Sequence, residues 1–200
     1  MKALIIGASG TIGSAIVSEL QGDTDITTAS LNKGDHQVDL SDHKSIMQLF
    51  KQIGKLDAIV CAAARGVVFK AIQDMSIEDY IASTQQKLFG QIQVALAGIK
   101  CLNNKGSITL TTGIMNHDFV ENGSAAAMTN NAVEGFVQAT ALDLPRGIRI
   151  NAVSPALLEE SVKIYGALCP GFEPVSSAKV ARAYRKSIYG IQTGRIYHVS

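Results

Sequence analysis

The sequence has few residues of the types that bind metals or form cross-links. It contains three cysteines and four histidines in 200 residues, and both types are dispersed. No Cys-x-x-Cys pair and no Cys/His group with zinc-ligand spacing occurs, so we expect no metal site. An odd number of widely spaced cysteines instead favours reduced, buried thiols, as is usual in the cytosol. The cysteines are Cys61, Cys101 and Cys169, and the histidines are His36, His43, His117 and His198.

The sequence also lacks an excess of positive or negative charge, and it lacks long apolar runs. Charged residues make up 18% of the chain and the formal net charge is +1, without the positive excess of a nucleic-acid-binding protein. No apolar run approaches the length of a membrane span, and Lys2–Ile6 is too short for the core of a signal peptide. We expect a cytoplasmic protein that binds neither nucleic acid nor membrane. Its expected partners are small molecules and further copies of itself.

Several enzyme classes also lack their motifs here. No Ser-His-Asp spacing, carboxylate pair or Walker lysine supports hydrolase or kinase chemistry. What the chain does have is 46% hydrophobic residues, enough for one domain with a real core. No linker, repeat or low-complexity stretch divides it, so residues 1–200 are expected to form one domain.

Short apolar runs alternate with amphipathic stretches along the whole chain. Strands that alternate with crossover helices form a parallel sheet covered on both faces. The sequence therefore predicts an α/β protein with a three-layer Rossmann fold, a doubly wound parallel sheet of about seven strands. Strands are expected at Lys2–Ile6, Asp25–Ser30, Gln37–Asp39, Leu56–Ala62, Gly106–Thr111, Ile148–Val153 and Arg195–Val199. Helices are expected at Thr11–Leu20, His43–Ile53 (capped by Ser41 or Asp42), Ser76–Leu102, Ala125–Leu142 and Ser177–Tyr189, and Pro155–Pro174 is expected to be irregular.

A glycine-rich turn links the first strand to the first helix. Residues 7–13 read Gly-Ala-Ser-Gly-Thr-Ile-Gly. In a dinucleotide-binding turn the first glycine makes the bend, the second lets phosphate approach and the third lets the helix pack on the sheet. The strand–turn–helix context favours phosphate binding over a purely structural turn. The residues expected to hold the cofactor phosphates are Gly7, Ser9, Gly10, Thr11, Ile12 and Gly13.

The spacing of these glycines resembles that of the short-chain dehydrogenase/reductase superfamily, and the second half of the chain strengthens the resemblance. Residues 131–136, Asn-Ala-Val-Glu-Gly-Phe, resemble the start of the family's dimer-forming, active-site helix. Residues 147–155, Gly-Ile-Arg-Ile-Asn-Ala-Val-Ser-Pro, resemble its sixth strand and following turn, and residues 193–196 its C-terminal Thr-Gly segment. The similarity covers essentially the whole chain. It implies a nicotinamide dinucleotide cofactor and a homodimer or homotetramer.

The end of the second strand bears on the choice of cofactor. An acidic residue there would bind the 2′-hydroxyl of NAD, but this chain has Ser30, Asn32 and Lys33. A hydroxyl, an amide and a cation suit a 2′-phosphate better, so NADP is favoured over NAD. The alternative is that Lys33 is only a solvated loop lysine.

The resemblance assigns further cofactor contacts. Asp39 and Leu40 match the pair that touches adenine, although Asp39 is alternatively a helix-capping residue. Small residues stand where the family usually has Asn-Asn-Ala-Gly, and Pro155 belongs to the turn after the sixth strand. The small residues are Ala62, Ala63 and Ala64.

The chain departs from the family at its catalytic motif. Where the family has Tyr-x-x-x-Lys, this chain has Ala126 and Asn130, and no register recovers the tyrosine. Thr112 falls at the position of the family's serine, which orients the substrate carbonyl. Lys87 falls at or near the position of its asparagine on the preceding long helix. Compared with the family pattern, lysine and asparagine have thus exchanged places between the two helices.

Two functions follow from this exchange. In the first, the protein is an NADP-dependent oxidoreductase that acts on a small carbonyl or alcohol, with Thr112, Lys87 and Asn130 in its catalytic site and Lys87 also on the cofactor ribose. In the second, Lys87 is a solvated helix lysine and the protein is a non-catalytic dinucleotide-binding sensor or partner subunit. His117 and Tyr165 are weaker candidates for moving a proton.

Overall fold

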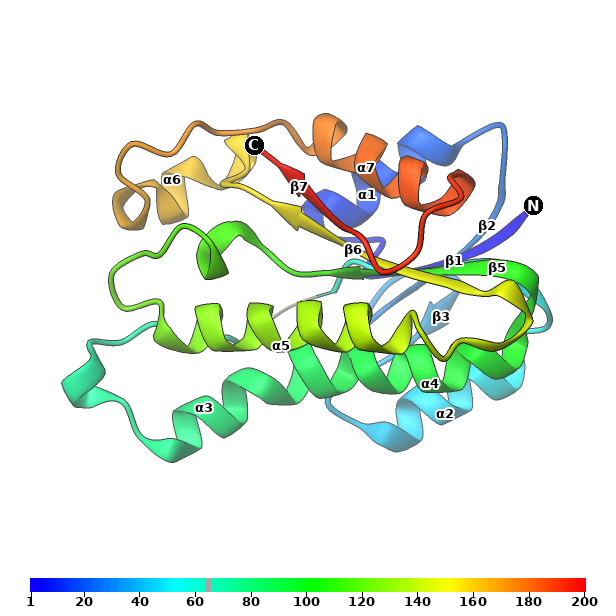
Figure 1. Cartoon of the computed structure of the whole chain (residues 1–200), viewed down its shortest axis with the longest axis horizontal. Coiled ribbons are helices and arrows are strands. Elements are labelled where there is room, and N and C mark those ends of the chain that lie inside the picture. Colours follow the sequence, from blue (N-terminus) through cyan, green and yellow to red (C-terminus); the bar gives the residue numbers. More distant parts are fainter. Residues whose placement is uncertain (64–65) are drawn as a thin grey trace.

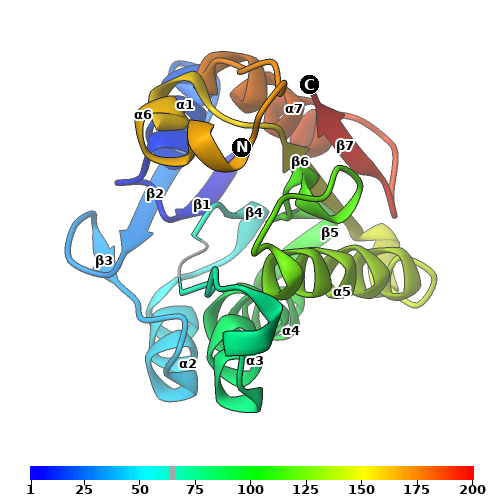
Figure 2. The ribbon, with the colours of Figure 1, turned by 90° about the vertical axis from the view of Figure 1, so that its left-hand side faces the viewer.

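A seven-stranded sheet with helices on both faces forms the molecule (Figures 1 and 2). The computed structural model describes residues 1–63 and 66–200. The strand order is β3-β2-β1-β4-β5-β6-β7 and every adjacent pair is parallel, which confirms the predicted Rossmann fold. The strands are β1 (Lys2–Ile6), β2 (Asp25–Ser30), β3 (His36–Gln37), β4 (Leu56–Cys61), β5 (Leu102–Thr111), β6 (Arg149–Pro155) and β7 (Ile196–Val199).

Alternate residues of each central strand are buried in opposite layers. In β1, Leu4 and Ile6 pack against one helical layer, and Ala3 and Ile5 pack against the other. Figure 2 shows α1 (Thr11–Leu20) and α7 (Ser177–Tyr189) on one face of the sheet. The opposite face carries α2 (His43–Gln52), α3 (Ile77–Thr84), α4 (Gln91–Cys101) and α5 (Ser124–Thr140).

Polar side chains set where several helices begin. Asp42 accepts a hydrogen bond from the backbone N–H of Lys44, so it is Asp42 and not Ser41 that caps α2. Ser76 and Asp79 form a reciprocal capping box at the start of α3. These caps satisfy backbone N–H groups that have no partner within the helix.

The expected single helix Ser76–Leu102 is interrupted, so that prediction was wrong in this part. A π-helical turn at Gln85–Gly90 separates α3 from α4. The buried side chain of Gln91 donates to the carbonyl of Lys87 at 2.6 Å and to that of Thr111 at 2.9 Å, and it accepts from the N–H of Thr111 at 2.8 Å. Gln91 thus ties the turn to the end of β5. A Cβ at Gly90 would lie 2.6 Å from the carbonyl oxygen of Leu40, so the close approach of these two segments requires glycine at this position.

Other boundaries differ by a few residues. β3 ends at Gln37 instead of Asp39, because the Asp39 carboxylate accepts from the N–H and hydroxyl of Ser41 and closes a turn there. β5 begins at Leu102 instead of Gly106, with a register shift in its pairing to β4. The segment expected to be irregular contains α6 (Val162–Tyr165), which lies beyond the carboxyl ends of the strands in Figure 1.

Within the described ranges, no helix combines the length and the apolar character that crossing a membrane requires.

Candidate functional site

Two adjoining cavities open at the carboxyl edge of the sheet. The first, the glycine cleft, has a volume of about 450 Å³ and lies over the turn after β1. The second, the lysine pocket, has a volume of about 470 Å³ and lies between α5, the π-helical turn and the segment around α6. Ile12 and Leu158 line both cavities, so one elongated ligand can reach from one into the other. In an open α/β sheet this edge is where ligands bind.

Glycine is required at two positions of the turn for steric reasons. Gly7 has a φ of +87°, and a Cβ there would lie 2.8 Å from backbone atoms of Ala62 and Ala63. A Cβ at Gly13 would lie 2.0 Å from the carbonyl oxygen of Gly7. A Cβ at Gly10, by contrast, would have only that same oxygen within 4 Å, at 3.4 Å. Gly10 therefore leaves its outer side free for a ligand.

The N-terminus of α1 is available to an anion. Gly10 occupies the N-cap position, and within residues 1–63 and 66–200 no side chain caps the helix. The unpaired backbone N–H groups of the first turn, together with the positive end of the helix dipole, favour a phosphate at this place.

Most predicted cofactor residues come together in the glycine cleft. Those that line it are Gly7, Ser9, Gly10, Thr11, Ile12, Ser30, Asn32, Lys33, Asp39, Leu40, Ala62 and Ala63. Gly13 lies behind the turn, and Ala64 falls outside the described residues. Pro155 and Lys87 line the lysine pocket instead. Sequence reasoning did not find Leu31, Val38, Gln86 and Leu158, which are apolar or neutral residues without a motif.

Of the two alternatives for Asp39, the helix-capping one is wrong, because Asp42 caps α2. Asp39 lines the glycine cleft, and its carboxylate closes the turn to Ser41 while Asp42 caps α2. The hydrogen bonds from the Ser41 hydroxyl and N–H hold the pKa of Asp39 below its ordinary value. At the end of β2, the Ser30 hydroxyl donates to the carbonyl of Lys33 and stabilises the turn that places Asn32 and Lys33 at the cleft.

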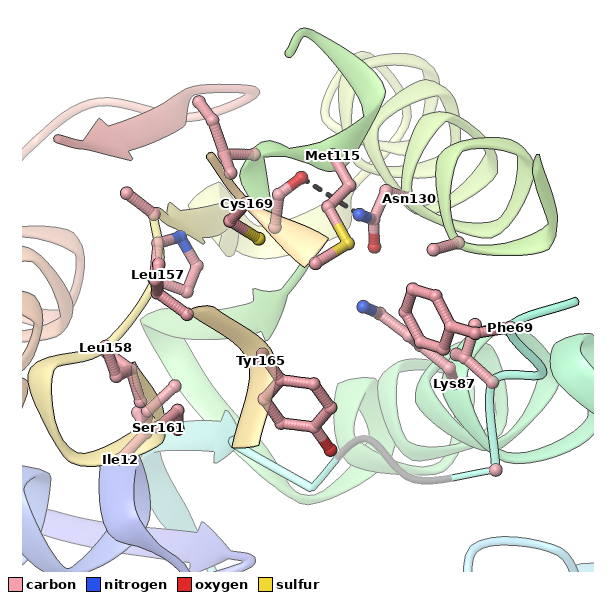
Figure 3. Close-up of a pocket in the computed structure, with 17 residues that line it drawn as sticks. Ile12, Phe69, Lys87, Met115, Asn130, Leu157, Leu158, Ser161, Tyr165 and Cys169 are labelled. Atoms are coloured by element: carbon pink, nitrogen blue, oxygen red, sulfur yellow. Dashed lines mark hydrogen bonds between the residues drawn. The ribbon is translucent and has the colours of Figure 1, made fainter. Parts of the chain in front are cut away.

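The lysine pocket brings Lys87 and Asn130 together. Figure 3 shows the two side chains entering the cavity from different helical segments and pointing toward one another. Asn130 donates from Nδ2 to the carbonyl of Gly113 at 2.9 Å. Its buried Oδ1 has no hydrogen-bond partner among the residues that the structure describes. Burial lowers the pKa of Lys87 to about 8.

These two groups complement a ligand hydroxyl. The Lys87 ammonium is a donor. The Asn130 Oδ1 is a buried acceptor to which no described residue donates, and such an acceptor is costly unless a ligand supplies the donor. A ribose hydroxyl both accepts and donates. The glycine turn, the open N-terminus of α1 and this pair therefore fit the phosphates and the nicotinamide ribose of a dinucleotide.

Thr112 is not brought into the lysine pocket. Its hydroxyl contacts the carbonyl of Asn130 and Oε1 of Glu134, both at 3.3 Å. Glu134 in turn lies 3.0 Å from Nε2 of His117. Thr112 and His117 thus contact α5, and neither is among the described residues that line the cavity. Thr112 holds the backbone of Asn130.

Residues of α5, α6 and the connecting segments supply the remaining walls. Tyr165, a weaker candidate from the sequence, lines the pocket with its ring, as Figure 3 shows. Ala126, which the motif resemblance aligns with the family tyrosine, also lines the pocket. Sequence reasoning missed the apolar and sulfur-containing wall residues because no periodic pattern marks loop residues. They are Val67, Phe69, Ile114, Met115, Leu157 and Cys169.

Comparisons with known proteins agree with this fold. A family model described as enoyl-(acyl carrier protein) reductase matches residues 12–186. The 1,2-dihydroxy-1,2-dihydronaphthalene dehydrogenase of Pseudomonas putida is 27% identical over 146 residues, which is 70% of this chain and 55% of that protein. The chain spans about half the length of the curated relatives it matches. It belongs to the short-chain dehydrogenase/reductase superfamily, as the motifs predicted.

Solved structures resemble the whole chain. Protein lin1944 from Listeria innocua is 46% identical with a TM-score of 0.97, and the match covers all of both chains. A small-chain dehydrogenase in complex with NADPH is 26% identical with a TM-score of 0.89, over all of this chain and 96% of the other.

Proposed function

We propose that this protein is an NADP-dependent oxidoreductase that acts on a small carbonyl or alcohol. The observation that carries the proposal is the junction of the two cavities, at which Lys87 lies beside Asn130 Oδ1, an acceptor without a partner among the described residues. The NADPH complex of a relative that is 26% identical supports the same cofactor class.

The residues of the pocket have distinct roles in this proposal. A bound nicotinamide cofactor supplies the hydride. The Lys87 ammonium would donate to a ribose hydroxyl of the cofactor and would tune proton transfer to the substrate, and Asn130 Oδ1 would accept from the same hydroxyl. Apolar walls such as Phe69 and Leu157 exclude water from the substrate. Thr112 positions Asn130 through its backbone carbonyl.

A second function, a non-catalytic dinucleotide-binding sensor or partner subunit, is favoured by one observation. Ala126 occupies the position of the family's proton-donating tyrosine and has no group that transfers a proton. Fluorescence titration with NADPH, followed by a turnover screen over simple aldehydes and ketones, separates the two. Tight binding without turnover of any of them would favour the sensor.

Cofactor preference gives a first testable prediction. NADPH is expected to bind at least about tenfold more tightly than NADH, or ~1.4 kcal/mol, because Lys33 at the cleft attracts the 2′-phosphate. Lys33→Ala should remove most of this preference in titrations with both cofactors. Lys44→Ala, on the exposed side of α2, is the matched control and should preserve it. Equal affinities in the unmodified protein would overturn the assignment.

Assembly gives a second prediction. Large apolar side chains are exposed along α3, the π-helical turn and α4, with Ile81 59%, Phe89 47% and Leu96 55% exposed. Figure 2 shows α3, α4 and α5 side by side on this face. Such a surface favours a symmetric partner copy, so we expect a dimer or tetramer at micromolar concentration. Sedimentation velocity should show it, and Leu96→Glu should dissociate it. A monomeric unmodified protein would contradict this expectation.

A further inference from the structure

Lys87 lies in surroundings that are unusual for a lysine. It is the only charged side chain among the described residues that line the lysine pocket. Most of the other described lining residues are apolar, and Figure 3 shows Phe69, Met115 and Tyr165 around the same cavity. No carboxylate among the described lining residues pairs with its ammonium group. The pocket therefore does little to stabilise the charged form.

Such surroundings make an amine reactive. Burial lowers the pKa of Lys87 from 10.5 to about 8, so a sizeable share of the amine is neutral near physiological pH. A neutral amine carries a lone pair that attacks carbonyl carbon, and desolvated lysines in apolar pockets are the ones that form Schiff bases. Figure 3 shows the amine directed into the open cavity and not into a wall.

Two neighbouring residues suit an addition reaction at this amine. Asn130 Oδ1 is buried and has no partner among the described residues, so it can accept a hydrogen bond from a hydroxyl that forms next to Lys87. Ala126 lies one helical turn before Asn130 and occupies little of the cavity. The whole cavity has a volume of about 470 Å³, which admits a small aromatic or aliphatic aldehyde.

We infer that Lys87 is a carbonyl-reactive amine that forms a reversible imine with small apolar aldehydes in the lysine pocket. The Nζ lone pair forms a bond to the carbonyl carbon, and one proton moves from nitrogen to oxygen to give a carbinolamine. The carbon–oxygen bond then breaks, the remaining proton on nitrogen leaves with the hydroxyl group as water, and the nitrogen lone pair completes the carbon–nitrogen double bond of the imine. Addition of water reverses both steps, so no oxidant or reductant is needed. The reaction needs no bound cofactor and is independent of the proposed function.

Trapping of the imine tests this inference in the cofactor-free protein. Benzaldehyde and sodium cyanoborohydride are added at about pH 7.5, and peptide mass spectrometry follows the benzyl adduct at each lysine. At this pH the neutral fraction of an amine with a pKa of about 8 is on the order of a hundredfold larger than that of one at 10.5. We expect the initial rate of adduct formation at Lys87 to exceed that at exposed Lys44 at least tenfold.

The Lys87→Arg variant is the matched control, because it keeps a cationic side chain that forms no stable imine. It should lose the fast adduct and keep the slow surface adducts. A rate at Lys87 equal to or below that at Lys44 would overturn the inference, even if the variant does not fold, since both rates come from the unmodified protein. A separate NADPH titration tests the proposed function. A failure of the imine inference can therefore be told apart from a failure of the proposed function.

Discussion

Lys87→Ala should weaken NADPH binding about ten- to a hundredfold. The ammonium group lines the lysine pocket beside Asn130, where the cofactor ribose is proposed to lie. Removing it deletes charge-assisted hydrogen bonds worth ~1.5–3 kcal/mol. If the protein turns over a carbonyl substrate, the variant should also be slower, because proton transfer to the substrate loses the nearby Lys87 ammonium. Fluorescence titration and steady-state rates measure the two effects.

The pH dependence offers a control within the unmodified protein. Burial lowers the pKa of Lys87 to about 8, so the ammonium is present below this pH and is lost as the pH rises through it. The share of NADPH affinity that depends on Lys87 should therefore fall between about pH 7.5 and about pH 9.5. Lys87→Ala should not show this fall. Unchanged affinity and turnover in Lys87→Ala would remove the lysine from the site and favour the sensor function.

Gly13→Ala should reduce both folding stability and NADPH binding. The new Cβ would lie 2.0 Å from the carbonyl oxygen of Gly7, so the glycine turn or α1 has to shift. Overpacking of this kind costs about 1–3 kcal/mol of unfolding free energy. A displaced turn also misplaces the N–H groups that would hold the phosphates, and NADPH affinity should fall at least about tenfold. Urea unfolding and cofactor titration measure the two losses.

Gly135→Ala is the matched control for this variant. Gly135 is an exposed residue of α5, and no atom lies within 4 Å of the position its Cβ would take. Alanine is favoured over glycine within a helix, so this change should leave stability unchanged or raise it by about 0.5–1 kcal/mol. A stable Gly13→Ala variant with full NADPH affinity would show that the turn tolerates the shift and that its backbone does not hold the phosphates.

The fold was predictable because it depends on local, repeated patterns. Buried strands such as Leu56–Cys61 read as short apolar runs, and helices such as Thr11–Leu20 follow an amphipathic period. The glycine turn was also predictable, because the positive φ of Gly7 and the close packing of Gly13 exclude other residues. The motif register placed Lys87 and Asn130 on two helices that face one another.

The directions in which side chains point, and the contacts between segments far apart in the chain, were not predictable from such patterns. The Gln91 side chain pairs with Thr111 twenty residues away, a contact that accompanies the π-helical turn carrying Lys87. Thr112 has a residue type suited to the site, but its hydroxyl turns toward α5 because Glu134 and the Asn130 carbonyl lie there.

The sequence by itself determined the Rossmann architecture, the glycine turn and the exchange of lysine and asparagine, because each depends on residue type and spacing along one segment. Only the tertiary structure decided that Lys87 and Asn130 share one cavity, that Asn130 Oδ1 has no partner there among the described residues, and that the loop around Tyr165 closes the apolar wall. The reason is that burial and unpaired hydrogen-bonding groups depend on segments far apart in the chain, and their relative positions arise only when the sheet brings them to one edge.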